Sequence, residues 1–179
     1  MSKPSSGLFH GTKGDVAFHG DAESVISSRV SGLDLREHPT TQKQLSSKQR
    51  KAINKKVKNR TATREEWKRK EWDRRIRERR KAGIDDFWAK ETIRLTTGQK
   101  GTRNWTSDQI SQILAGKRPK YKGRSMESHH TYSVQKYPHL ANLGEIIYPA
   151  TFDEHRYGWH GGNTKNSLPG RRIRPIVEF

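Results

Sequence analysis

Residues 127–163 read ESHHTYSVQKYPHLANLGEIIYPATFDEHRYGWHGGN. This stretch holds five of the chain's eight histidines, among them the adjacent pair His129 and His130 and a second pair, His155 and His160, five positions apart. Imidazole is the commonest metal ligand in proteins and the usual general base near neutral pH. Two such pairs in one short segment favour a metal site with a base beside it over histidines scattered on the surface.

The segment around the first pair predicts two short strands. Residues 126–133 form the first expected strand, EIIYPA at residues 145–150 forms the second, and a proline-containing loop joins them. Adjacent residues of a strand point to opposite faces. One histidine of the pair can therefore bind a metal ion while the other serves a substrate.

The second pair falls on a predicted short helix. Thr151 can cap this helix, with Glu154 as the partner three residues on, and glycines from position 158 onward end it. On a regular α-helix, residues three or four positions apart share a face. His155 and His160 are five apart, so we expect the last turn of the helix, near Gly158, to be deformed.

These motifs together resemble a known superfamily. SHH at residues 128–130, followed by IIYPATFDEH and GWHGGN, is similar to HNH/endonuclease VII nucleases, and in particular to bacterial polymorphic or Rhs-type toxin nucleases with an SHH signature, relatives of the GHH toxins. The resemblance implies an α+β fold, in which a mainly helical basic N-terminal part precedes a ββα-metal module, also called a His-Me finger.

The resemblance also implies roles for the four histidines. His129 matches the metal ligand on the first strand, and His130 matches the general base that activates water. His155 and His160 match the ligands supplied by the helix. One divalent ion would lie between these side chains and the scissile phosphate.

Three further residues are candidates for supporting roles. Asn142 is the nearest counterpart of the asparagine that orients the base in the superfamily. Asn163 can replace a helix histidine as the third ligand, because the relatives space their helix histidines by four and not by five. Glu154 completes the set as the capping partner of the helix.

The sequence leaves the identity of the metal open. Three neutral imidazoles favour a transition metal such as Zn²⁺ or Ni²⁺, whereas the resemblance admits Mg²⁺ or Mn²⁺. The chain has no cysteine, which excludes thiolate sites and disulfide bonds.

The overall charge points to a polyanionic partner. The 179 residues include 37 lysines and arginines against 19 acidic residues, a net charge of +18, and only 29% are hydrophobic. The electrostatic field of such a charge favours nucleic acid as the partner first and an anionic membrane second. The sequence has no apolar run of about 18 residues, so no membrane span is expected, and its N-terminus lacks the apolar region of a signal peptide.

We expect three segments: an N-terminal loop and helix at 1–42, a basic helical region at 43–120 and the nuclease module at 121–179. Within the second segment, residues 43–81 contain 18 basic against 5 acidic side chains, a net charge of +13. This density favours a phosphate-binding arm over a merely solvated charged helix. The candidate nucleic-acid-binding residues are Lys68, Arg69, Arg74, Arg75, Arg79, Arg80, Lys120, Lys122 and Arg124.

Capping boxes divide the basic region into helices. Ser46 with Gln49 and Thr63 with Glu66 open two of them, and Thr106 with Gln109 opens a third. Gly83 is expected to close the second helix, after which residues 84–95 continue helically. Outside this region, Asp21 can cap a helix beginning at residue 22, and the tail 168–179 can form an edge strand.

The leading hypothesis is a metal-dependent endonuclease, with DNA favoured over RNA by the resemblance. It would be the toxic domain of a larger secreted effector, made in a bacterial cytoplasm, delivered to the cytoplasm of a target cell and neutralised by an acidic immunity protein. One alternative is a non-catalytic nucleic-acid-binding protein with a structural histidine-bound metal. Another is a basic translation- or phage-related protein without metal.

Overall fold

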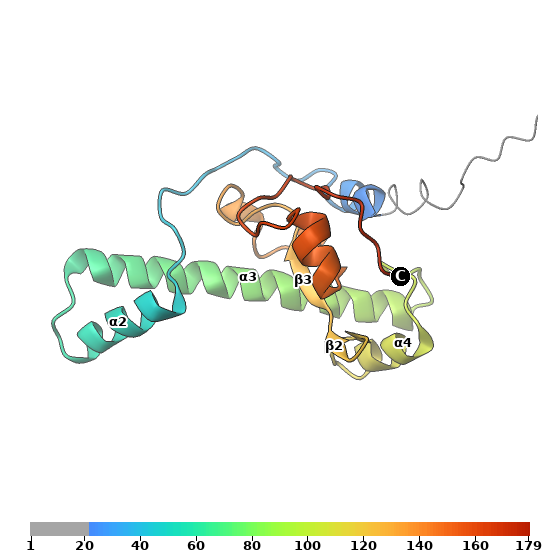
Figure 1. Ribbon diagram of the computed structural model, residues 1–179, viewed down its shortest axis with the longest axis horizontal. Helices are drawn as coiled ribbons and strands as arrows, with labels where there is room; N and C mark the ends of the chain where they lie inside the picture. The colour runs from blue at the N-terminus through green and yellow to red at the C-terminus, as the bar shows by residue number, and fades with distance from the viewer. Residues whose placement is uncertain (1–21) are drawn as a thin grey trace, which may run out of the picture.

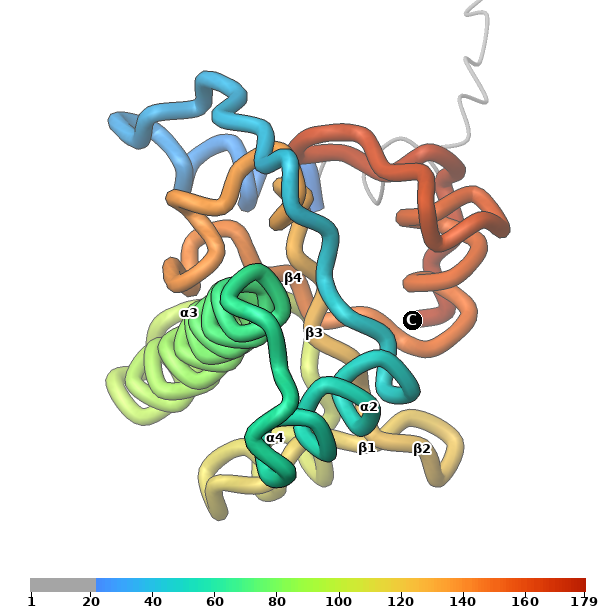
Figure 2. The backbone as a smooth tube through the Cα atoms, turned by 90° about the vertical axis from the view of Figure 1, so that its left-hand side faces the viewer, coloured from blue at the N-terminus to red at the C-terminus, as the bar shows by residue number. Residues whose placement is uncertain are grey.

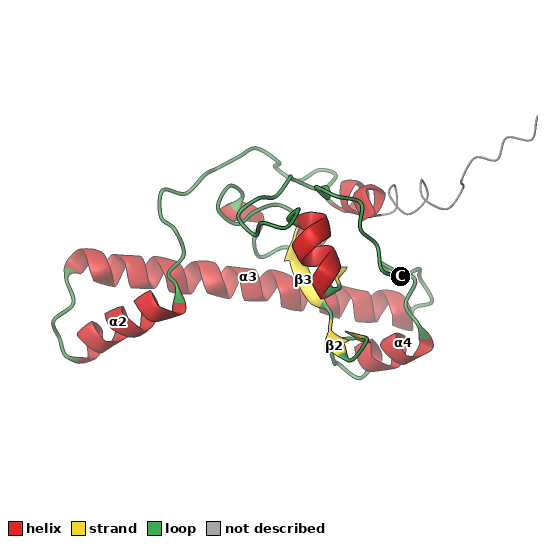
Figure 3. Ribbon diagram, viewed as in Figure 1, coloured by secondary structure: helices red, strands yellow, loops and turns green. Residues whose placement is uncertain are grey.

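The computed structural model describes residues 22–179, and it combines helices with two very small sheets (Figure 3). The predicted α+β class is confirmed. The α-helices are α2 (Ser47–Lys58), α3 (Arg64–Thr96) and α4 (Ser107–Leu114), and residues 22–29 form a further helix. The strands are β1 (Lys120–Tyr121), β2 (Arg124–Ser125), β3 (Glu127–His130) and β4 (Ile147–Ala150). None of the helices within residues 22–179 has both the length and the apolar character needed to cross a bilayer.

The 33-residue helix α3 is the element against which the rest of the chain packs (Figure 1). Its buried residues fall on a single stripe: Asp73, Ile76, Gly83, Phe87 and Glu91. These positions are three, four or seven residues apart, the spacing of one helix face. Charged side chains dominate the rest of α3, although Trp88 and Leu95 add partly buried contacts with the core clusters.

The prediction that Gly83 ends a helix is wrong, because α3 continues without a break to Thr96. A Cβ atom at position 83 would collide with the carbonyl oxygen of Ala141. The glycine therefore allows the loop that contains Ala141 to lie directly against the helix backbone. Its role is close packing and not helix termination.

The three predicted capping boxes are all present, at Ser46, Thr63 and Thr106. Helix α2 buries none of its residues and lies alongside the N-terminal part of α3 (Figure 1). The two helices form a basic arm, defined here as residues 47–81. The buried carboxylate of Asp73 fastens the base of this arm by accepting a 2.7 Å hydrogen bond from the backbone N–H of Leu45.

The two predicted strands of the histidine segment are confirmed as the antiparallel pair β3–β4, each four residues long. In this pair His129 lies opposite Tyr148 and His130 lies opposite Ile147. Every residue of β4 is buried, which fits its continuous apolar sequence. The strands are shorter than predicted, because the chain turns after His130 and a 3-10 turn, η2 (Gly144–Ile146), precedes β4.

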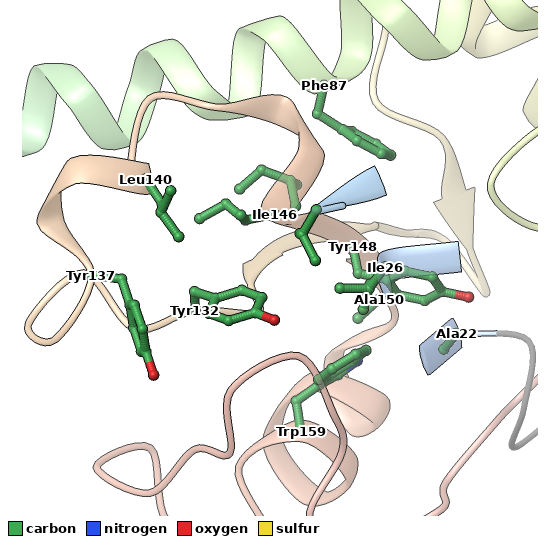
Figure 4. Packing of buried hydrophobic residues seen from close by; sticks show 12 residues of the cluster. Ala22, Ile26, Phe87, Tyr132, Tyr137, Leu140, Ile146, Tyr148, Ala150 and Trp159 are labelled. Atoms are coloured by element: carbon green, nitrogen blue, oxygen red, sulfur yellow. The ribbon is translucent and has the colours of Figure 1, made fainter. Parts of the chain in front are cut away.

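The main core lies between α3, β4 and the helix 22–29 (Figure 4). It contains residues from each of the three predicted segments, for example Ile26, Phe87 and Tyr148. The helix predicted from residue 22 is confirmed, whereas its proposed cap, Asp21, lies outside the described residues. The division into 1–42, 43–120 and 121–179 stays a prediction.

The C-terminal tail is extended but pairs only through one isolated bridge, between Leu168 and Arg171. The predicted edge strand is therefore wrong. Pro169 and Pro175 remove backbone donors that a strand would need. The tail ends with the ring of Phe179 stacked on Tyr121, with centroids 5.1 Å apart.

Candidate metal centre and active site

A π-helical turn, η3 (Glu154–Trp159), follows β4 and presents the second histidine pair. The predicted capping box is present, because Thr151 Oγ1 accepts from Glu154 N and Glu154 accepts from Thr151 N. In a π-helix the backbone hydrogen bond spans five residues, and here His160 N donates to His155 O over 3.1 Å. The expected deformation is confirmed, and it explains how a spacing of five places both imidazoles on one face.

Three histidines converge from this turn and from β3. The Nε2 atoms of His155 and His160 are 3.2 Å apart. The ring of His129 lies 4.9 Å from the ring of His155 and 5.0 Å from that of His160, centroid to centroid. One nitrogen from each of the three falls within 4.8 Å of the others. Segments that are far apart in the sequence thus form one cluster of nitrogen donors.

Hydrogen bonds fix which nitrogen of each helix histidine carries a proton. His160 Nδ1 is 2.6 Å from the backbone oxygen of Asn166, which can only accept, so Nδ1 carries the hydrogen. His155 Nδ1 is bound to the carboxylate of Glu127 in the same way. A carboxylate or carbonyl behind the imidazole is the usual way that proteins orient a metal-binding histidine. Both Nε2 atoms are left with lone pairs that point towards one another.

On the third histidine, His129, the Nε2 atom is buried and has no hydrogen-bond partner among the described residues. A buried polar atom without a partner is costly. One nitrogen from each of three histidines meets here, so the residues present fit a divalent ion that accepts nitrogen ligands. The donor set does not identify the ion.

Burial favours the neutral form of His129 and His155, which is the form that binds metals. Burial lowers the pKa of His129 well below its ordinary value, and the charges of His155 and His160 lower it further. Burial also lowers the pKa of His155, although the Glu127 carboxylate opposes this. The centroid of the buried Trp159 ring lies 4.7 Å from that of His129, so this ring shields one side of the imidazole from water.

His130 lies next to this cluster, and its protonation state is also fixed. Its Nε2 donates to the backbone oxygen of Ala141 over 3.1 Å. The lone pair is therefore on Nδ1, for which the described residues provide no hydrogen-bond partner. Burial, followed by the charge of Arg80, lowers the pKa of His130 to about 4. A neutral imidazole with a free Nδ1 is suited to accept a proton.

Arg79 of α3 holds the loop that orients His130. Its guanidinium donates to the backbone oxygens of Pro138 and His139, at 3.2 and 3.0 Å, and to Asn142 Oδ1 at 2.7 Å. These three bonds bracket Ala141, whose carbonyl accepts from His130. Arg79 was predicted to bind nucleic acid, but the structure commits its guanidinium to the protein. Asn142, the predicted counterpart of the orienting asparagine, lies in this loop and not among the metal-facing nitrogens.

All four predicted histidines open into one cleft of about 910 Å³. Arg80 of α3 also lines it, and its Nη1 donates to Gln44 Oε1 over 2.8 Å. Burial lowers the pKa of this guanidinium from its ordinary value. Figure 2 shows the segment that carries Gln44 descending between α3 and the C-terminal segment. The cleft thus combines possible nitrogen ligands, a proton acceptor on His130 and the positively charged guanidinium of Arg80.

Residues 70–151 match a family model described as a GHH signature containing HNH/Endo VII superfamily nuclease toxin. The match supports the HNH/Endo VII superfamily. It covers most of α3 and both strands of the histidine segment, but it ends before His155 and His160. The case for those two residues therefore rests on geometry. No curated protein and no solved structure matches the chain.

The other two predicted supporting residues are, like Asn142, not brought to the metal-facing nitrogens. Asn163 is exposed, and its Oδ1 accepts from Lys165 N over 3.0 Å. Glu154 is buried in a bidentate ion pair with Arg103, with 2.8 Å from its Oε1 to Arg103 Nη2. The first closes a turn after the helix, and the second ties the start of the helix to a distant loop.

The other predicted nucleic-acid-binding residues lie on two surfaces. Lys68, Arg69, Arg74 and Arg75 lie on the basic arm, and Lys120, Lys122 and Arg124 lie on the β1–β2 hairpin. On the arm, Arg74 is engaged by Glu71 and Glu78, at 3.1 and 2.6 Å. Exposed pairs of this kind are weak, so Arg74 stays available to a stronger anion.

The sequence analysis missed Glu127 and the carbonyl groups of Ala141 and Asn166. Glu127 could have been found, because it lies two positions before His129 on a strand and therefore on the same face. The two carbonyls carry no signal in the sequence, since any residue supplies one.

A second group of possible metal ligands consists of Asp34, His38 and His139, whose ligand atoms also lie within 4.8 Å of one another. It is more exposed than the first, and both carboxylate oxygens of Asp34 are already engaged by Arg36. The site formed by His129, His155 and His160 is less exposed, and among the described residues its nitrogens are free of competing salt bridges to arginine, so it is the better candidate metal centre.

Proposed function

We propose that this chain is a metal-dependent endonuclease and that β3, β4 and η3 form a ββα-metal module. The observation that carries this proposal is the convergence of one ring nitrogen from each of His129, His155 and His160 beside a neutral His130 whose Nδ1 is free. The match to nuclease toxins over residues 70–151 supports the same reaction class.

The chain's own residues divide the work of phosphodiester hydrolysis. His129, His155 and His160 would hold the ion, which supplies Lewis-acid polarisation of the phosphate when bound. His130 Nδ1 accepts the proton of the attacking water. Arg80 faces the same cleft and donates to the phosphoryl oxygens, where negative charge develops. Ala141 keeps His130 in the tautomer that this step requires.

The test is cleavage of plasmid DNA by wild type and His130→Ala, with and without chelator. Wild type should cut only when the metal is present. The variant should lose on the order of 10²–10⁴ in rate and keep its metal and fold. An exposed neighbour of the metal centre, replaced as Asn163→Ala, is the matched control and should cut like wild type. Full activity of His130→Ala would disprove the role of the base.

The binding-module alternative makes a different prediction in the same experiment. A non-catalytic protein with a structural metal would retard DNA migration without cutting it. Structural sites are usually closed by four protein ligands, whereas three nitrogens converge among the described residues. This open arrangement favours the enzyme.

We further propose that the substrate is DNA and that the chain acts as the toxic domain of a bacterial effector, delivered into a target cell. A nuclease of this kind endangers the cell that makes it, so we expect an acidic immunity protein. The net charge of +18 would steer such a partner quickly onto the basic surface. Expression without a partner should cause nucleoid loss with wild type but not with His130→Ala. Harmless expression of wild type would contradict the toxin role.

A further inference from the structure

We propose that the cleft continues past Arg80 into a second phosphate-binding hollow, which receives the backbone of the bound nucleic acid beyond the scissile position. The hollow has a volume of about 460 Å³ and shares Gln44 and Arg80 with the histidine-lined cleft. This inference rests on the proposed nuclease function and adds to it the path that the substrate follows.

Basic side chains from three separate parts of the chain line this hollow. Arg50 comes from α2, Arg77 and Lys81 come from α3, and Arg118 comes from the segment between α4 and β1. Among residues 22–179, Asp85 is the one acidic side chain that lines the hollow, and it is bound to Lys81. The hollow therefore carries a strong positive charge, which is the property that binds phosphate without reading base sequence.

Arg118 gives the clearest indication that the hollow receives an anion. Its Nη1 is buried and has no hydrogen-bond partner among the described residues. Its guanidinium lies over the ring of Trp88, 5.0 Å from the centroid, so the side chain is held in place. A buried guanidinium nitrogen without an acceptor is costly, and a phosphate oxygen would satisfy it.

Arg50 is also held in position before any ligand binds. Its Nη1 donates to the backbone oxygen of Leu45 over 2.7 Å, and its Nη2 donates to Ser47 Oγ over 3.1 Å. Cations that are already fixed lose little conformational entropy on binding.

Continuity with the cleft decides which polyanion fits. Arg80 lines both spaces, so a single chain with regularly spaced phosphates can place one phosphate beside the histidines and a later one against Arg118. A nucleic-acid strand has this repeat. An acidic protein surface would not need to enter both spaces, so we assign the hollow to the strand.

The test is binding of a fluorescent single-stranded oligonucleotide with phosphorothioate linkages, which keep their charge and resist hydrolysis. Anisotropy is measured for the full chain, for Arg118→Ala and for Lys117→Ala. Lys117 is the matched control, because it carries the same charge one position away but does not line the hollow. We expect Arg118→Ala to weaken binding roughly tenfold more than the control and to reduce the salt slope by about 0.7.

Lys81→Ala provides a second measurement, because loss of Arg118 can disturb the packing of Trp88. The Lys81 side chain is largely exposed, so its removal should weaken binding without changing the melting temperature. Equal affinities of Arg118→Ala, Lys81→Ala and Lys117→Ala would overturn the hollow and leave the nuclease proposal intact. Failure of wild type to cut plasmid would overturn the nuclease proposal, while a binding difference between the variants would still support the hollow.

Discussion

His155 Nε2 and His160 Nε2 face each other at 3.2 Å across a single π-helical turn. Both Nδ1 atoms are committed to acceptors, Glu127 for the first and the Asn166 carbonyl for the second. Neither Nε2 can therefore donate to the other while both rings are neutral. A cation bound between the two Nε2 atoms would satisfy both lone pairs. The π-helical turn is what brings these two atoms together.

Replacing any one of His129, His155 and His160 by alanine should lower the metal content by one equivalent per chain. Each change removes one of three converging nitrogens, and the remaining two hold the ion weakly. Elemental analysis after dialysis measures this, with Asn163→Ala as a control that keeps wild-type content. Stoichiometric metal in two of the three histidine variants would mean that the ligand set is wrong.

Glu127→Gln should weaken metal binding about 10- to 100-fold without removing any ligand. The carboxylate orients His155 and raises the basicity of its Nε2, and outer partners of this kind have effects of that size. Competition with a chelating dye gives the affinity. Glu65→Gln on the exposed face of α3 removes the same charge and should have no effect. An unchanged affinity in Glu127→Gln would show that His155 needs no such partner.

Gly83→Ala should destabilise the protein although it raises helix propensity. In an open helix this change gains about 1 kcal/mol, but here the new methyl group would press on the Ala141 carbonyl. Overpacking of this kind costs about 1–3 kcal/mol, and the displaced carbonyl would release His130. We expect a lower melting temperature and a lower kcat with unchanged metal content. Arg75→Ala, at an exposed position of α3, should melt like wild type, and a stabilised Gly83→Ala would contradict the packing.

Stability should fall below about pH 4.5, partly through Glu154. Burial would raise the pKa of this carboxyl, but the hydrogen bond and charge of Arg103 reverse the effect and hold it below its ordinary value of 4.5. A lowered pKa contributes stability that is present above the unfolded value and lost as the pH falls through the folded one.

Arg103→Ala checks this ion pair directly. It leaves a buried carboxylate without its partner, which should cost about 3–5 kcal/mol of unfolding free energy near neutral pH. Denaturant titrations between about pH 3 and pH 7, where carboxyl groups titrate, give the unfolding free energy. We expect this free energy to fall less with decreasing pH in the variant than in wild type. Parallel curves for wild type and variant would show that Glu154 does not respond to Arg103.

Features that depend on neighbouring residues were predicted well from the sequence. Contacts between residues far apart in the chain were not. Capping boxes such as Thr63 with Glu66 are decided within one turn of helix, so the sequence contains all the information they need. Gly83 is the opposite case, because the residue that requires a glycine there, Ala141, lies 58 positions later in the chain. The positions of His129 and His130 followed from strand alternation, while the backbone carbonyls that fix the rings of His130 and His160 have no residue type to reveal them.

Because α3 is unbroken through Gly83, its length sets the distance between the two ends of the surface that it displays. At 1.5 Å per residue, its 33 residues extend about 50 Å, the length of roughly 15 base pairs of B-form DNA. A duplex that touches both ends of α3 must be at least that long. If the proposed nuclease binds duplex DNA along the whole helix, shorter fragments would not reach the distal part of the basic arm. Digestion should then slow as the products shorten and leave a limiting size.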